Sequence, residues 1–83
     1  EGLLELKKHD EENETQYMET LRAYLEEHLS ATQAARKLFI HRSTFLYRLD
    51  RIKEILQSEL DDPEEIFYLE LSFRLLEQEQ EKE

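Results

Sequence analysis

The fold is decided by one stretch of sequence, residues 30–53: SATQAARKLFIHRSTFLYRLDRIK. Ser30 or Thr32 can cap a helix here, and Ser30 with Gln33 three positions later matches a capping box. We expect this first helix to run to about Phe39. A tight turn is expected next, near residues 39–41.

A second, longer helix is expected after the turn, beginning at His41 or Ser43. Its apolar residues recur at steps of four, three and four, which is the spacing of one buried stripe on an α-helix: Phe45, Leu49, Ile52 and Leu56. The pattern predicts a helix-turn-helix within residues 31 to 57. The other sides of this helix carry a basic, hydroxyl and aromatic surface, which consists of Arg42, Ser43, Leu46, Tyr47, Arg48 and Arg51.

Positive charge gathers on the same stretch. Residues 36–53 hold six basic residues and one acid, Asp50, a balance of about +5 in a chain whose net charge is −10, so the remainder carries about −15. Such segregation suits a nucleic-acid reader, because one face attracts phosphate while the acidic remainder discourages attachment over the whole surface.

Length and composition favour one all-α domain spanning residues 1–83. One Gly, one Pro and 39% charged residues suit helices packed on helices and give too little turn chemistry for a multi-stranded sheet. The absence of cysteine excludes disulfides and thiolate metal sites. Without a signal peptide or a long apolar run, we expect a soluble cytoplasmic protein with no membrane contact. The start at Glu1 suggests a piece of a longer protein.

Two helices are expected before the central stretch. The first spans residues 1–9, an acid-rich linker covers residues 10–14, and Asn13 or Thr15 caps the helix that follows. That scaffold helix spans residues 15–29, where apolar side chains recur at mostly three- and four-residue steps: Tyr17, Met18, Leu21, Tyr24, Leu25 and Leu29.

A last helix should start at Asp62-Pro63, with Asp62 as its cap and Pro63 at its first position, and run to about Gln78, after which the polar tail frays. Its expected core side is Ile66, Phe67, Leu69, Phe73 and Leu76. A second apolar row is too wide for one core contact and indicates a subunit or domain interface: Tyr68, Leu71 and Leu75. We expect it to support a homodimer or higher homo-oligomer.

The segment from Leu38 to Leu49 resembles the helix-turn-helix of the PucR family of bacterial transcription regulators, which includes sugar-diacid and purine-catabolism regulators. The matching motifs are L-R-A-Y-L at 21–25, H-R-[NS]-T-[LF]-x-Y-R-[LI] at 41–49, Arg51-Ile52, and D-D-P at 61–63. Two positions depart from the family pattern: Ser43 replaces the usual Asn, and Leu46 stands where many relatives carry Arg. The resemblance implies a C-terminal DNA-binding domain, similar to that of Fis, that follows a larger signal-sensing region.

On this interpretation residues 42–57 form a recognition helix in the major groove of double-stranded DNA. Arg42, near its start, is the candidate for a bidentate contact to guanine, and His41 either reads a neighbouring base or only shapes the turn. Thr44, Tyr47 and Arg48 are candidates for phosphate, as is Thr32 through its hydroxyl and backbone N–H. Arg51 is a more distant backbone clamp. Leu46 either touches a thymine methyl or faces solvent.

The competing interpretations remain open at this stage. Arg48 and Arg51 can instead pair with Asp50 and Glu54 on a solvated helix, and the basic face can dock an acidic protein rather than DNA. We expect no enzyme activity, because the sequence has no nucleophile elbow, phosphate-binding glycine loop or isolated carboxylate pair. No cofactor or metal is expected either, since His28 with Glu26 or Glu27 lacks a third ligand.

Overall fold

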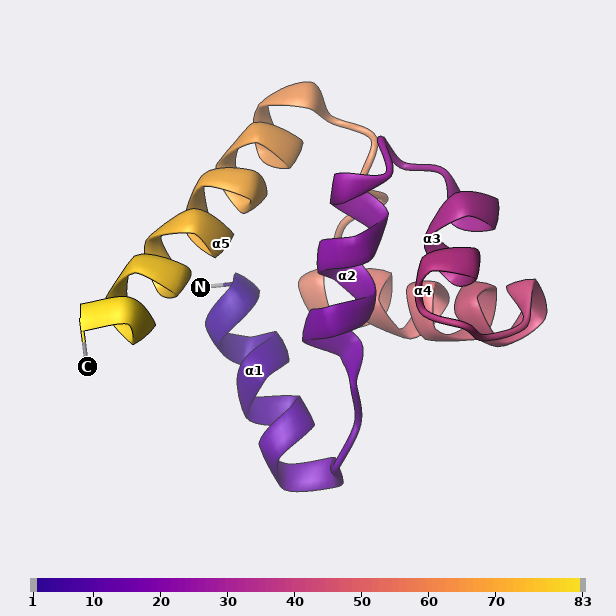
Figure 1. The fold of residues 1–83 in the computed structure, drawn as a ribbon, viewed down its shortest axis with the longest axis horizontal. Helices are drawn as coiled ribbons and strands as arrows, with labels where there is room; N and C mark the ends of the chain where they lie inside the picture. Colours follow the sequence, from indigo (N-terminus) through magenta and orange to yellow (C-terminus); the bar gives the residue numbers. More distant parts are fainter. Residues whose placement is uncertain (1, 83) are drawn as a thin grey trace.

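The protein, described here by a computed structural model covering residues 2–82, is built from helices alone in that range (Figure 1). The expected all-α class and helix-turn-helix are confirmed. The helices in chain order are α1 Gly2–Asn13, α2 Tyr17–Glu26, α3 Ala31–Lys37, α4 Arg42–Leu56 and α5 Pro63–Lys82.

Helix α2 occupies the centre of the molecule, with α3 on one side and α1 and α5 on the other, and α4 crosses behind it from α3 toward α1 (Figure 1). It packs against each of the other four helices, and α1 and α3 also pack against α4. The core where these helices meet contains the largest fully buried side chains: Phe45, Leu6, Leu21, Ile52 and Thr20.

The amino-terminal half of the helix-turn-helix forms as the capping pattern predicts. The Ser30 side chain accepts a hydrogen bond from the backbone N–H of Gln33 at 3.2 Å. Helix α3 ends at Lys37, two residues before the expected Phe39. Phe39 itself adopts a left-handed backbone with φ of 60°, which reverses the chain toward α4.

The second helix also follows its apolar pattern. Phe45, Leu49 and Ile52 are buried, whereas Leu56 at the end of the stripe is only partly covered. The Phe45 ring lies 5.9 Å from that of Tyr24 on α2, centroid to centroid. His41 is the N-cap of α4 through its backbone and makes no capping bond with its side chain. The helix ends at Leu56, where Gln57 takes the left-handed conformation.

The linker predicted at residues 10–14 is wrong, because α1 continues through Asn13. An acidic run of this kind is expected to face solvent, yet the Asp10 side chain contacts the backbone of Tyr17, seven residues later. Its carboxylate accepts hydrogen bonds from the backbone N–H groups of Tyr17 at 2.9 Å and Met18 at 2.8 Å. The Asp10 side chain therefore caps α2 from α1, the role expected of Asn13 or Thr15, and the Thr15 hydroxyl donates to it as well.

The other bounds of the scaffold helix also need correction. Helix α2 starts at Tyr17 and ends at Glu26, shorter at both ends than the expected 15–29. His28 and Leu29 have positive φ values of 57° and 66°, so the chain has left the helix before Leu29. Leu29 is consequently 38% exposed rather than part of the core.

The start of α5 is as predicted, since the Asp62 carboxylate accepts a hydrogen bond from the backbone N–H of Glu64 at 3.1 Å. Leu69 and Phe73 are buried, and Ile66 and Leu76 pack against the core. Phe67 was wrongly assigned to that core face and is 65% exposed, because it lies about 100° around the helix from Ile66. The helix runs to Lys82, beyond the expected end at about Gln78, and Glu83, the last residue of the tail predicted to fray, lies outside the described residues.

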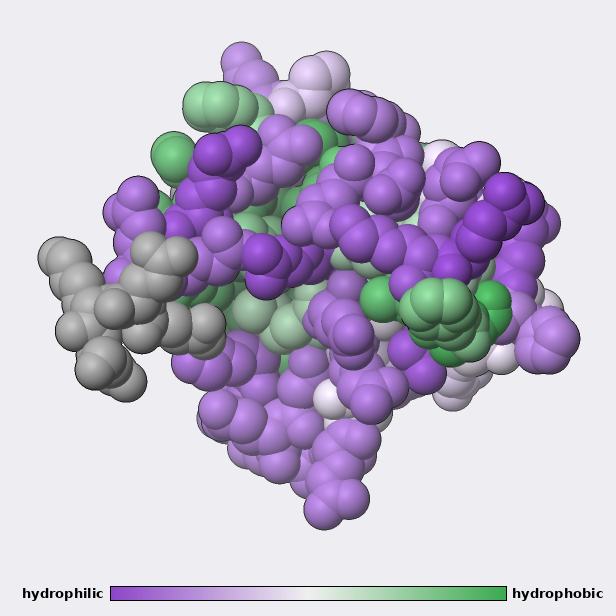
Figure 2. Space-filling view, viewed as in Figure 1, coloured by the Kyte–Doolittle hydropathy of each residue, from purple (hydrophilic) through white to green (hydrophobic). Residues whose placement is uncertain are grey.

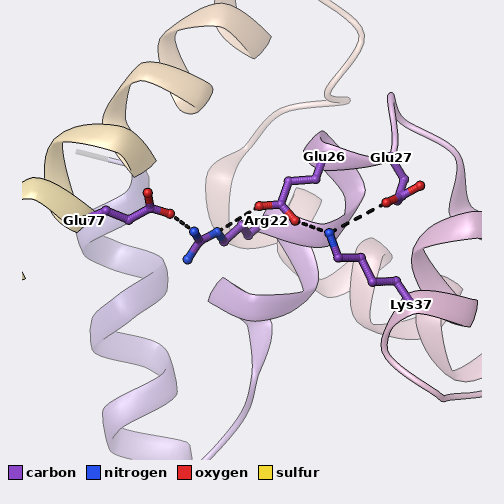
Figure 3. Close-up of polar contacts among 5 residues, drawn as sticks. All are labelled: Arg22, Glu26, Glu27, Lys37 and Glu77. Atoms are coloured by element: carbon purple, nitrogen blue, oxygen red, sulfur yellow. Dashed lines mark hydrogen bonds and ion pairs between the residues drawn. The ribbon is translucent and has the colours of Figure 1, made fainter.

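A chain of ion pairs connects α5, α2 and α3 (Figure 3). Arg22 on α2 pairs with Glu77 on α5 and, at 3.2 Å, with Glu26 one turn along α2. Lys37, in the last turn of α3, pairs with Glu26 and lies 3.7 Å from Glu27. The network holds α3 and α5 to opposite sides of α2 at the surface of the molecule.

Replacing Phe45 by Ala should lower the free energy of unfolding by about 2–5 kcal/mol, because it removes a fully buried ring and leaves a cavity. Leu49→Ala should have an effect in the same range. Urea unfolding followed by circular dichroism measures the loss. Tyr47→Ala, which truncates a side chain that is 64% exposed, is the matched control; an equal loss in the control would show that the buried face is wrongly assigned.

Acidification should weaken the ion-pair network. The hydrogen bond from Lys37, and less strongly that from Arg22, lowers the pKa of Glu26 below its usual value, although burial opposes this. A carboxyl whose pKa is lower in the folded protein stabilises the fold above its unfolded pKa and loses that contribution as the pH falls through the folded pKa.

Glu26→Gln should therefore reduce stability near neutral pH, and the difference from the parent protein should disappear as the pH falls through the lowered pKa of Glu26. The effect should be small because these side chains are nearly half exposed. Thermal unfolding across a pH series measures it. Glu12→Gln removes the same charge on α1, outside the network, and a matching pH dependence in that variant would contradict the assignment.

Candidate nucleic-acid interface

The amino-terminal ends of α3 and α4 meet through their side chains. Arg42, the first residue of α4, donates from Nε to the hydroxyl of Thr32 on α3 at 3.0 Å. Both residues are exposed. The turn thus places residues ten positions apart in the chain next to each other, and the terminal nitrogens of the guanidinium remain as donors for a ligand.

The residues that follow Arg42 share its exposure. His41, Ser43, Thr44 and Tyr47 are all exposed. Ser43 and Tyr47 are spaced by four residues and project opposite to the buried Phe45, because two residues correspond to about 200° of helix rotation. Leu46 is half-buried, so part of its side chain is exposed beside these residues.

Arg48 does not form the pair with Asp50 that the sequence left open. It is half-buried at the edge of α4, and its Nη1 donates to the hydroxyl of Thr20 on α2 at 3.4 Å. Thr20 is fully buried and donates its own proton to the backbone oxygen of Gln16 at 2.7 Å. The sequence reasoning missed Thr20, because its contact with Arg48, 28 residues along the chain, depends on how α2 packs against α4.

Arg51 does form the pair that the competing interpretation allowed. Its Nη1 lies 3.4 Å from a carboxylate oxygen of Glu54, three residues later on α4. The two side chains are 45% and 69% exposed, so water screens this pair and it is weak. The guanidinium can exchange Glu54 for a phosphate without a large cost.

The positive charge of the stretch 36–53 is partly neutralised. Besides Arg51, Lys37 is paired, and its hydrogen bond to Glu26 raises its pKa. Among the side chains that the structure describes, the other four basic residues have no carboxylate within the 4.0 Å of an ion pair: Arg36, Arg42, Arg48 and Lys53. The available charge is therefore concentrated on α4 and the end of α3.

An exposed aromatic side chain lies beside this surface. Phe39, in the turn between α3 and α4, is 94% exposed. Figure 2 shows a compact hydrophobic group over that turn, surrounded by hydrophilic residues. The sequence placed Phe39 in the turn but did not indicate that its ring would lie in solvent.

A hollow of about 430 Å³ lies between α2 and α5, away from the helix-turn-helix. It is lined by charged residues of the surface network, including Arg22, Glu26 and Glu77, together with His28. These charges largely satisfy one another, so the hollow is a weaker candidate for a site than the α3–α4 surface. Within residues 2–82, no helix is both long and apolar enough to cross a membrane.

Comparisons with known proteins agree with the geometry of α3 and α4. A family model described as the PucR C-terminal helix-turn-helix domain matches residues 17–75. The purine catabolism regulatory protein of Bacillus subtilis (strain 168) is 40% identical over 58 residues, which are 70% of this chain and 11% of that protein. The proline-responsive transcriptional activator PutR of the same organism is 40% identical over 57 residues, 69% of this chain and 14% of that protein.

No solved structure matches the chain. The two relatives are much longer proteins, of which the matched segments are a small part. The family model covers all of α2, α3 and α4 and much of α5, well over half of the chain. With its capped α3, its tight turn and its basic α4, the chain belongs to the family of PucR C-terminal helix-turn-helix domains, which are DNA-binding domains of transcription regulators.

Proposed function

We propose that this domain binds double-stranded DNA in a sequence-specific way, with α4 as the recognition helix in the major groove. The observation that carries the proposal is the cluster at the start of α4. Arg42 is exposed, oriented by Thr32 and followed by exposed Ser43 and Thr44. Residues at the start of a recognition helix are those that reach base edges in helix-turn-helix proteins.

The proposed contacts divide by position. The terminal nitrogens of Arg42 suit a bidentate contact to O6 and N7 of guanine, and His41 lies beside it. Thr32, Ser43, Thr44 and Tyr47 offer hydroxyl groups to the phosphates on either side, and Arg48 and Arg51 offer guanidinium groups further along α4. Phosphate contacts supply affinity and base contacts supply the choice of sequence.

We also propose that the domain is the output module of a longer cytoplasmic regulator whose effector is sensed elsewhere in that protein. The support is the family membership together with the length of the two relatives, one of which is named as a proline-responsive activator.

Arg42→Ala and Arg48→Ala should affect DNA binding in different ways. Arg42→Ala should cost about 1–3 kcal/mol on the preferred duplex and relax the choice at one base pair. Arg48→Ala should weaken all duplexes about equally and lower the salt slope by about one, because one fewer counterion is released. Fluorescence anisotropy measures the affinity of both variants at several salt concentrations, on a duplex selected from a random pool and on its scrambled version.

Lys8→Ala is the matched control for these variants, since it removes one positive charge from an exposed position on α1. It should leave the salt slope and the base preference nearly unchanged. If Arg48→Ala changes base preference while Arg42→Ala weakens binding uniformly, the reading surface is rotated from the one described. If the parent protein shows neither salt dependence nor sequence preference, it is a protein-interaction module instead.

We further propose that the domain forms a homodimer through the outer face of α5. Tyr68, Leu71 and Leu75 are 49%, 44% and 55% exposed, and Phe67 adds to the same face, opposite the buried stripe of α5. A two-fold interface there would present two α4 helices to half-sites about 34–36 Å apart.

Leu71→Lys should shift the protein toward monomer in sedimentation equilibrium and reduce binding to a duplex with two half-sites more than to one with a single half-site. Burying a lysine in an apolar contact between copies is unfavourable, which is the reason for the expected shift. Leu4→Lys, at a 60% exposed leucine on α1, is the control. A parent protein that stays monomeric at high concentration and needs one half-site would contradict the proposal.

A further inference from the structure

Thr20 is the buried polar residue of the described core, and its hydroxyl has a fixed orientation. The side chain is fully buried in α2. Its single proton is donated to the backbone oxygen of Gln16, which also accepts the backbone N–H of Thr20 at 3.1 Å. Only the lone pairs of the hydroxyl oxygen remain, so toward Arg48 the Thr20 hydroxyl can act only as an acceptor.

Arg48 is the residue that uses those lone pairs. Its Nη1 donates to Thr20 across the α2–α4 contact at 3.4 Å, and a guanidinium carries five N–H donors in a planar fork. Nη1 is held by the core, whereas Nε and Nη2 make no hydrogen bond within the described part of the chain, and the side chain is partly exposed. A long side chain that would otherwise sample many rotamers is thereby restrained before any ligand arrives.

The partner of Arg48 is a neutral hydroxyl, so no neighbouring negative charge offsets the positive charge of the guanidinium. Among the described side chains, no carboxylate lies within 4.0 Å of this guanidinium. Arg51 differs, because it must release Glu54 before it can bind a phosphate with both edges. A hydroxyl acceptor orients an arginine without competing electrostatically with the phosphate.

We infer that Thr20 is a positioning residue for DNA binding, whose hydroxyl holds the Arg48 guanidinium in the orientation that receives a backbone phosphate. The inference rests on the proposed function. Thr20 touches no DNA itself; it acts through Arg48 by reducing the conformational freedom that phosphate binding must remove.

Thr20→Val tests this role, because valine keeps the shape of threonine and removes the hydroxyl. Thr20→Val should raise the dissociation constant about 3- to 10-fold on selected and scrambled duplexes alike and lower the salt slope by up to about one. Thr20→Ser, which keeps the hydroxyl, should bind like the parent protein. In an Arg48→Ala background, Thr20→Val should cause no further loss, since the group that it positions is gone.

The outcomes separate this inference from the proposed function. A parent protein that does not bind duplex DNA overturns both. A parent protein that binds, with Thr20→Val binding equally well, overturns the role of Thr20 alone. An equal loss from Thr20→Val with and without Arg48 also overturns it, because that result identifies a general structural effect. If Thr20→Val does not fold, Thr20→Ser and Thr20→Ala make the same comparison, as both lose the methyl group and only serine keeps the hydroxyl.

Discussion

The burial of the apolar stripe of α4 determines which residues of this helix face outward. Phe45 and Ile52 are fully buried and Leu49 nearly so, which fixes the rotation of α4 about its own axis. Because successive residues of a helix are separated by about 100°, the same rotation turns Ser43 and Tyr47 outward. A different rotation would bury polar side chains without partners, at a cost of a few kcal/mol each, and the outward face is therefore defined by the core.

Helix α2 connects this core to the rest of the domain through polar contacts with its four neighbours. Asp10 of α1 caps its first turn, Thr20 accepts from Arg48 of α4, and Arg22 pairs with Glu77 of α5. Glu26 completes the set by pairing with Lys37 of α3. The two exposed ion pairs add little stability individually, but each contact favours one register of its helix on α2. The spacing between α3 and α4 follows from both helices packing on the same support.

Two of the three arginines proposed to contact DNA are held in the same manner. Arg42 donates to the hydroxyl of Thr32 and Arg48 to that of Thr20, whereas Lys37 and Arg51 lie against carboxylates. The protein has a net charge of −10, yet on this surface the charges of Arg42 and Arg48 are not offset by a paired carboxylate. Neutral acceptors orient such groups and leave their electrostatic attraction for phosphate undiminished.

The sequence by itself determined the features that arise within a few residues. Helical spacing identified the buried stripe of α4, and Ser30 and Asp62-Pro63 marked helix starts, because periodicity and capping depend on neighbours within about one turn. The roles of Asp10 and Arg48 were decided only by the tertiary structure. A flexible charged side chain has several possible partners at similar sequence distance, and only the crossing of α1 or α4 with α2 selects among them. Thr20 became part of the arrangement for the same reason: its distance from Arg48 is set by helix packing, and no local pattern encodes it.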